Sequence, residues 1–401
     1  MDRIPLVLRL VIAIFLGFIL GSILGPLSRE GYVTANVPIQ LLTTFNGLFS
    51  NFLGFIVPLL ILSFVAVGIG ELGQGAGKML GITIFLAYTS TTLAAFLALM
   101  VGTGVLPNFL NNGTVDLNTI QNLNEFLPSA YFDIAMPGVF SAMTALILAF
   151  VLGVGLASSD QDSALFSSVK TFQNIIEKVI TNIIIPLLPF HIAGIFASMA
   201  FGGKAIEIMR MMAIVFALII VMHWTILIVH YIVAGLVKKV NPFTLLKNMI
   251  PAYVAAIGTQ SSTATMPVTH RQMIKNGLSE DVANFTVPLF ATIHMPGSVI
   301  TVTTCAIAVS TIMGHSLDMT QLIGFILMLG VMMVAAPGVP GGSIMASIGI
   351  LESMLGFDPI MISLMVTLYL AQDSFGTATN VTSDGALAFM VEKVVKKQKA
   401  S

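Results

Sequence analysis

Apolar runs long enough to cross a lipid bilayer recur along this 401-residue chain, and no other feature restricts its fold as strongly. The chain is 56% hydrophobic and only 9% charged, whereas soluble domains carry roughly a quarter charged residues. A soluble chain of this length would need a charged shell that this sequence lacks. We therefore expect an all-α integral membrane protein, because a helix satisfies its own backbone hydrogen bonds in lipid.

The apolar runs divide into eight complete spans and two interrupted segments. A helix needs about 20 apolar residues to cross ~30 Å of hydrocarbon. We predict complete spans near residues 4–25, 40–70, 80–106, 134–157, 173–200, 207–237, 282–313 and 359–391. The interrupted segments are 243–275, which is broken around Ser261, Ser262 and Pro267, and 321–356, which is broken between Pro337 and Gly342. The first run is too long for a cleaved signal peptide, so we expect a retained span.

The basic residues indicate which loops face the cytoplasm. They fall in alternate predicted loops, at the first span and in the tail, at Arg3, Arg9, Lys78, Lys170, Lys178, Lys238, Lys239, Lys247, Lys393, Lys396, Lys397 and Lys399. The positive-inside rule therefore puts both termini on the cytoplasmic side of a cell membrane. Arg29, Lys204 and Arg210 fall on the opposite side and weaken the bias.

This orientation gives the two interrupted segments opposite directions. The first would start and end inside, and the second would start and end outside. Two re-entrant helical hairpins of inverted orientation are typical of inverted-repeat transporters, where irregular backbone lines a central cavity. The alternative is that both segments are ordinary kinked spans.

A polar stripe lies within the last predicted span. Its members are separated by 4, 3 and 4 residues, so they share one helix face over roughly 16 Å; they are Asp373, Thr377, Asn380 and Asp384. A carboxylate at membrane depth costs at least ~2.5 kcal/mol, and no Lys or Arg occurs from Asn276 to Glu392. The partners of the two aspartates are therefore cations, an ammonium group or protons. The alternative is that both carboxylates bond to helix ends.

The break of the first interrupted segment is rich in hydroxyl side chains. Residues 258–267 read Gly-Thr-Gln-Ser-Ser-Thr-Ala-Thr-Met-Pro. Hydroxyls and free backbone N–H groups at the start of a half-helix favour an anion such as a carboxylate. A Ser/Thr run alone is more typical of a loop. Together with the acidic stripe, however, it predicts a zwitterion site with the carboxylate at this break and the ammonium at an aspartate.

Other function classes fit less well. A net charge of −1 argues against a nucleic-acid partner. A channel would need a continuous hydrophilic pore and would not need a pair of hairpins. An intramembrane enzyme would need a catalytic constellation, but the two aspartates of the stripe lie three turns apart, and the chain lacks Gly-x-Ser-x-Gly and His-Glu-x-x-His motifs. We expect a secondary transporter and no enzyme.

These segments, in this order, resemble the dicarboxylate/amino acid:cation symporter family, which has the glutamate-transporter fold. The resemblance is most specific from about 250 to 391. It rests on Thr265-Met266-Pro267, on 288–298, on Gly338-Val339-Pro340-Gly341-Gly342-Ser343, and on Asp373, Asn380 and Asp384. Within the family, Gln372-Asp373-Ser374 and Thr377-Ala378 look closest to the bacterial serine/threonine sodium symporter branch.

The resemblance implies a homotrimer that works by an elevator-type motion. Residues 1–75 and 134–240 would be mainly scaffold, and 76–133 the third helix and an outer loop. Residues 241–391 would form the moving transport domain, and 392–401 a basic cytoplasmic tail.

The resemblance also assigns roles to individual residues. Asp373 would hold the substrate ammonium, and Asn380 its carboxylate. The substrate contacts that it implies are Ser261, Ser262, Thr263, Gly338, Val339, Pro340, Asp373, Gly376, Thr377 and Asn380. The coupling ion would be sodium, held at one site by Asp384 and Asn380, at a second by Thr292, and at a third by Thr89 and Ser90.

Three departures from the family pattern modify this expectation. Members that take acidic amino acids carry arginine where this chain has Gly376, and some carry one where it has Gln260. A second substrate carboxylate would therefore be buried without a counter-charge. The family motif Asn-Met-Asp-Gly-Thr is here His-Met-Pro-Gly-Ser, from His294 to Ser298. Pro296 removes the carboxylate of the third sodium site, and His294 is either a packed side chain or a proton carrier.

We therefore expect a sodium-coupled importer of a small neutral amino acid, such as serine or threonine. The alternative is a proton-coupled symporter, or one for dicarboxylates or acidic amino acids, with the same fold.

Overall fold

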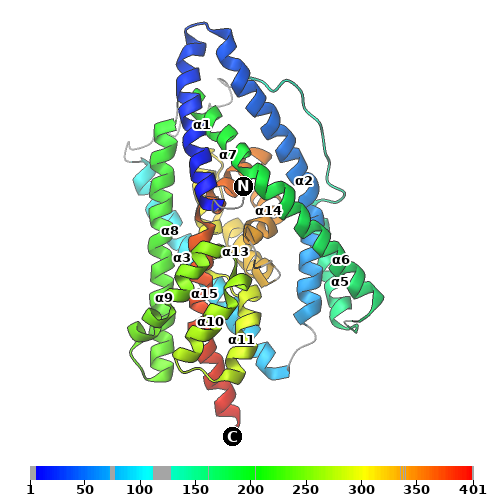
Figure 1. Ribbon diagram of the computed structural model, residues 1–401, viewed down its shortest axis with the longest axis vertical. Coiled ribbons are helices and arrows are strands. Elements are labelled where there is room, and N and C mark those ends of the chain that lie inside the picture. The colour runs from blue at the N-terminus through cyan, green and yellow to red at the C-terminus, as the bar shows by residue number, and fades with distance from the viewer. Residues whose placement is uncertain are drawn as a thin grey trace.

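The computed structural model describes residues 6–72, 77–111, 128–160, 162–203, 205–334, 336, 338 and 340–399. All regular structure in these ranges is helical (Figure 1). The longer helices of the first half are α1 (Leu6–Arg29), α2 (Asn36–Leu72), α3 (Gly77–Asn111), α5 (Ala142–Ala157), α6 (Ala164–Val179), α7 (Ile185–Phe201) and α8 (Ala205–Lys238). Those of the second half are α9 (Pro242–Thr259), α10 (Ser262–Lys275), α11 (Glu280–Ile293), α12 (Pro296–Ile312), α13 (Met319–Val334), α14 (Gly342–Leu355) and α15 (Pro359–Lys399).

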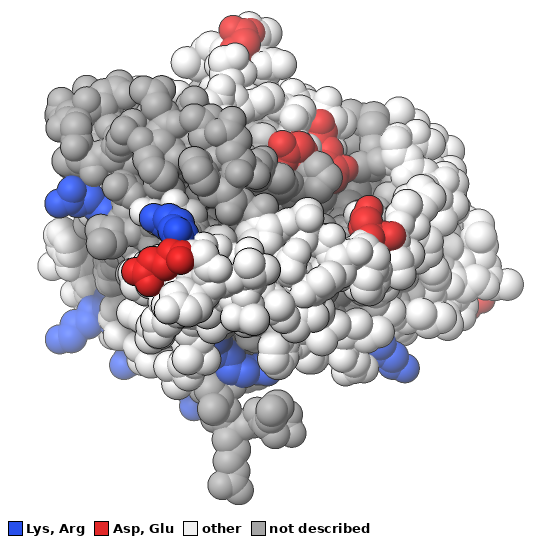
Figure 2. Space-filling model, turned by 90° about the horizontal axis from the view of Figure 1, so that it is seen from above, with Lys and Arg blue, Asp and Glu red and all other residues white. Residues whose placement is uncertain are grey.

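The exposed faces of the helices carry apolar side chains where a soluble protein would carry charged ones. Phe85, Leu93 and Met100 of α3 are 61% to 73% exposed. Among the described residues, six helical stretches are long and apolar enough to cross a membrane, judged by length and composition. Figure 2, seen from the top of Figure 1, shows few acidic or basic residues among mostly uncharged ones. The prediction of a helical, multi-pass membrane protein is confirmed.

Small residues allow α1 to lie directly against α7. Gly17, Gly21 and Gly25 share one face of α1, and each has its Cβ position against the α7 backbone. A Cβ on Gly21 would lie 2.1 Å from the carbonyl oxygen of Ala197. Such close backbone approach is typical of helix packing in membranes. α2 packs in turn against α5, α6 and α7, so these five helices form one group, which we call the outer group.

A second group surrounds α12 and α15. Every residue of α12 except Thr311 is buried, which is expected for a helix that is apolar on all sides. α15 packs against α8, α9, α11 and α12, and α3 packs against α12 and α13. The helical stretch from 280 to 312 is interrupted at His294 and Met295, because Pro296 has no backbone N–H to continue the ladder of α11. The interruption falls within 288–298, one of the segments on which the resemblance rests.

Two helix pairs complete the second group: α9 with α10, and α13 with α14. The first pair is joined at residues 259–263, the first tip, where Gln260 adopts a left-handed conformation with φ 53°. The second is joined at the second tip, whose described residues are 336, 338 and 340–342; there Gly341 has φ 74°. The tips touch, since the Ser261 hydroxyl donates to the Gly338 carbonyl at 2.8 Å. In Figure 1 the first pair lies in the lower half of the molecule and α14 lies above it.

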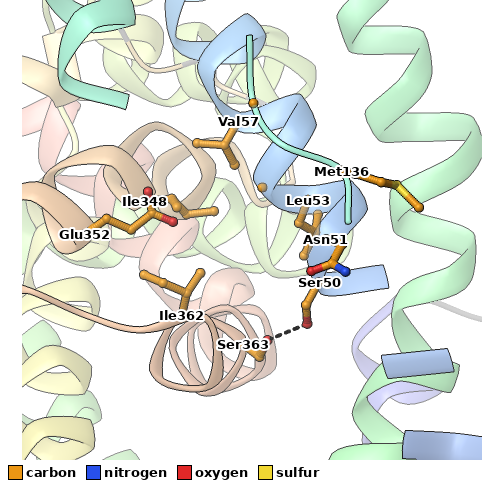
Figure 3. A pocket seen from close by; sticks show the side chains of 11 residues that line it. Ser50, Asn51, Leu53, Val57, Met136, Ile348, Glu352, Ile362 and Ser363 are labelled. Carbon is orange, nitrogen blue, oxygen red and sulfur yellow. Dashed lines mark hydrogen bonds between the residues drawn. The ribbon is translucent and has the colours of Figure 1, made fainter. Parts of the chain in front are cut away.

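The outer group and the second group are not tightly packed everywhere. A cavity of about 160 Å³ lies between α2 on one side and α14 and α15 on the other (Figure 3). Leu53 and Val57 of α2 face Ile348 and Glu352 of α14 across it. Protein interiors are otherwise close-packed, so the groups pack loosely at this place, where the hydroxyls of Ser50 and Ser363 are joined at 3.1 Å.

Candidate functional site

The two tips, the break between α11 and α12, and the middle of α15 meet around one small cavity. Its lining residues are Gln260, Ser262, Met295, Ser298, Gly338, Ser343, Asp373, Thr377 and Asn380. It has about 10 Å³ for the centre of a water-sized sphere, which is room for roughly one water molecule. A larger ligand would therefore require some of the lining residues to move.

Asp373 contributes the negative charge of this cavity. Its side chain is 3% exposed, and Oδ2 accepts a hydrogen bond from the backbone N–H of Gly341 at 2.7 Å. The positive φ of Gly341, which glycine adopts without strain, belongs to the turn that presents this N–H at the second tip. The carboxylate thus joins α15 to the second tip and faces a polar cavity.

Asn380 is tied to the beginning of α12. Its Oδ1 accepts from the backbone N–H groups of Gly297 at 2.8 Å and Ser298 at 3.2 Å. Its Nδ2 donates to the Ser298 hydroxyl oxygen at 2.9 Å, which also accepts from the Tyr369 hydroxyl at 3.1 Å. N–H groups at a helix start lack partners within the helix, so Asn380 supplies one from α15.

The predicted substrate contacts come together only in part. Ser262, Gly338, Asp373, Thr377 and Asn380 line the cavity. Ser261 and Thr263 bond to the Gly338 carbonyl beside it. Gly376 lies against α12 instead, and Val339 lies outside the described residues. Pro340 is half-buried in the second tip.

Several residues near the cavity were not predicted as site residues. Ser298, Ser343 and Met295 line it, and Tyr369 reaches Ser298 from α15. Tyr369 lies four residues before Asp373, on the same face of the helix. That spacing was the signal that could have found it.

Ser261 holds the first tip together and joins it to the second. Its hydroxyl caps α10 by accepting from the Ala264 N–H at 3.2 Å and donates to Gly338. Loss of a helix cap costs roughly 0.5–2 kcal/mol. Ser261→Ala should therefore lower the thermal unfolding midpoint of the purified protein. Ser353→Ala is the control, because among the described residues Ser353 bonds only back within α14; an equal shift in both variants would contradict this role.

A buried chain of hydrogen bonds lies beside the cavity. It runs from Ser383 to His230 Nδ1 (3.0 Å), from His230 Nε2 to Ser90 (3.0 Å), from Ser90 to His294 Nε2 (2.9 Å), and from His294 Nδ1 to Asp384 Oδ1 (2.7 Å). We call these five residues the histidine chain. They come from α3, α8, the α11–α12 break and α15, and each is less than 10% exposed. His230 was not predicted, although a histidine inside the apolar span 207–237 was a signal for it.

The oxygen atoms that the resemblance assigned to sodium differ in their surroundings. Asp384 and Ser90 both bond to imidazole nitrogens in the histidine chain, and Asn380 bonds to α12. Among the described residues, the Thr292 hydroxyl has one hydrogen bond, which it donates to the Leu289 carbonyl within its own helix at 2.8 Å, so its oxygen can still act as an acceptor or a cation ligand. The second tip lies against the preceding residue, because a Cβ on Gly338 would be 2.7 Å from the Ala291 carbonyl oxygen.

Comparison with known proteins matches most of the chain to one family. The family model described as the sodium:dicarboxylate symporter family matches residues 6–394. Proteins named serine/threonine transporter SstT are similar along most of their length. The one from Acinetobacter baumannii (strain ATCC 17978) is 25% identical over 96% of this chain and 95% of its own. Those from Streptococcus suis and Streptococcus agalactiae are 28% and 27% identical, over 84% and 97% of this chain and 93% and 96% of their own.

Proposed function

Because this chain belongs to the sodium:dicarboxylate symporter family, we propose that it imports a small neutral amino acid, serine or threonine, together with sodium. It is a membrane transporter and not an enzyme. The observation that carries the proposal is a buried Asp373 in a cavity whose described lining contains no Lys or Arg. The names of the relatives, serine/threonine transporters, agree with it.

The chemistry of the cavity suits a zwitterion with an uncharged side chain. The Asp373 carboxylate is a partner for the substrate ammonium. The start of α10 at Ser262 has backbone N–H groups for the substrate carboxylate. Gln260 and Thr377 add neutral polar groups for a hydroxyl side chain. A dicarboxylate would bury a second negative charge without a counter-charge, which is unfavourable by several kcal/mol per ion.

We propose eight spans with two re-entrant hairpins, α9–α10 and α13–α14, and cytoplasmic termini in the cell membrane. In support, the two pairs meet tip to tip. The loose contact in Figure 3 suits an elevator-type motion of the second group against the outer group of a trimer. We assign α3 and α8 to the moving unit, because the histidine chain bonds both helices to α15. For α8, this assignment differs from the expectation that 134–240 is mainly scaffold.

Sodium coupling would use the oxygens at Thr292 and the second tip. A hydroxyl beside the carbonyls of a tight turn supplies the oxygen ligands that hard cations prefer. A sodium ion at this place would bridge α11 and the second tip, so it would hold that tip closed over the substrate. Binding of sodium and substrate would thus favour each other, as symport requires.

Competition for serine uptake tests the proposal. In proteoliposomes with a sodium gradient, uptake of radiolabelled serine should be blocked by excess threonine and reduced by alanine. Aspartate and succinate should have little effect, because the cavity holds no counter-charge for their second carboxylate. Competition by aspartate or succinate at low concentration would contradict the neutral substrate. Uptake driven by a pH gradient alone, with no response to sodium, would instead make His294 the coupling residue.

A further inference from the structure

The hydrogens of the histidine chain can be placed in one consistent direction. With Asp384 ionised and both histidines neutral, His294 must donate from Nδ1 to Asp384. Its Nε2 then accepts, so Ser90 donates to it and accepts in turn from His230 Nε2. His230 Nδ1 finally accepts from the Ser383 hydroxyl. Each donor in this chain meets an acceptor, and buried polar groups satisfied in this way are stable.

This arrangement uses two of the oxygens that the resemblance assigned to sodium. Asp384 Oδ1 and the Ser90 hydroxyl each point at an imidazole instead of at a shared empty centre. Hard cations require several oxygen ligands, and imidazole nitrogen is a poor substitute. Pro296, at the start of α12, contributes no side-chain oxygen. With these two oxygens bonded to imidazoles and no carboxylate at Pro296, the residues at this place fit a sodium ion poorly.

We propose that the histidine chain replaces the cation sites implied at Asp384 and at Ser90, so that a single sodium, at Thr292 and the second tip, accompanies each substrate. The inference rests on the proposed function, because it concerns how many ions that symport uses. The N–H of His294 takes the place of a cation beside the Asp384 carboxylate. The other bonds of the histidine chain join α3, α8 and α15 to one another without a bound ion.

The wild-type protein gives the first test. In proteoliposomes held at zero membrane potential, a tenfold sodium gradient should support an internal serine excess of about tenfold at equilibrium if one sodium is coupled, and about a hundredfold if two are. We expect the tenfold value. An excess near a hundredfold, with transport otherwise as proposed, would overturn this inference and leave the proposed function standing. Accumulation without any response to sodium would overturn both.

A pair of variants gives the second test. Asp384→Asn removes the charge that a sodium ion would need, but its amide oxygen still accepts from His294. The sodium concentration for half-maximal serine binding should therefore change less than about threefold. Thr292→Val keeps the shape of its side chain but removes the proposed ligand, and should raise that concentration at least about tenfold. A loss of sodium dependence in folded Asp384→Asn, with Thr292→Val unaffected, would overturn the inference. If Asp384→Asn does not fold, the gradient measurement decides.

Discussion

Replacement of Asp373 by Asn should weaken serine binding at least about tenfold, because a buried charge-assisted hydrogen bond contributes roughly 1.5–3 kcal/mol. The carboxylate is the negative group among the lining residues of the cavity, and we propose it as the partner of the substrate ammonium. Asparagine keeps an oxygen that can accept from the Gly341 N–H, so the second tip should keep its position. The loss would therefore report the charge and not a collapse of the tip. Equilibrium binding of serine to the purified protein measures it.

Asp358→Asn is the matched control for this experiment. Asp358 lies at the start of α15, where its Oδ1 accepts from the Met361 N–H, far from the cavity lining. This variant should bind serine as the wild type does. Unchanged serine affinity in Asp373→Asn, with normal folding, would place the ammonium site elsewhere.

Gly297→Ala should abolish serine transport and lower the thermal unfolding midpoint. A Cβ at this position would lie 2.4 Å from the carbonyl oxygen of Gly376 and 2.7 Å from the Thr379 Cβ. α12 and α15 would have to move apart, and overpacking of this kind typically costs roughly 1–3 kcal/mol. The shift would also disturb the bonds from Asn380 to the start of α12. Uptake assays and thermal unfolding in detergent measure both effects.

Gly81→Ala controls for the glycine substitution itself. Gly81 lies in α3, and nothing lies within 4 Å of its Cβ position. Alanine should be neutral there, or stabilising by roughly 0.5–1 kcal/mol, because glycine is costly within a helix. If Gly297→Ala were as stable and active as Gly81→Ala, the close contact of α12 with α15 would not limit function.

The polar stripe shows how far the sequence can predict a site. Spacing alone put Asp373 and Asp384 on one helix face, and the missing Lys and Arg indicated unusual partners for both. Asp373 does face the cavity. Asp384, however, bonds to His294, which lies 90 residues earlier in the chain. Histidine was considered as a proton carrier but not as the partner of this carboxylate, because nothing in the sequence indicates that α15 passes the α11–α12 break at that level.

The sequence by itself determined that this protein is a bundle of membrane helices, and where most of these begin and end. Lipid cannot hydrogen-bond the backbone, so composition and apolar run length suffice for that conclusion. Only the tertiary structure decided that the two tips meet at Gly338, that Asn380 binds the start of α12, and that two histidines join α3, α8 and α15. These contacts join residues 77 to 204 positions apart in the chain, and side-chain packing, not local pattern, selects such partners.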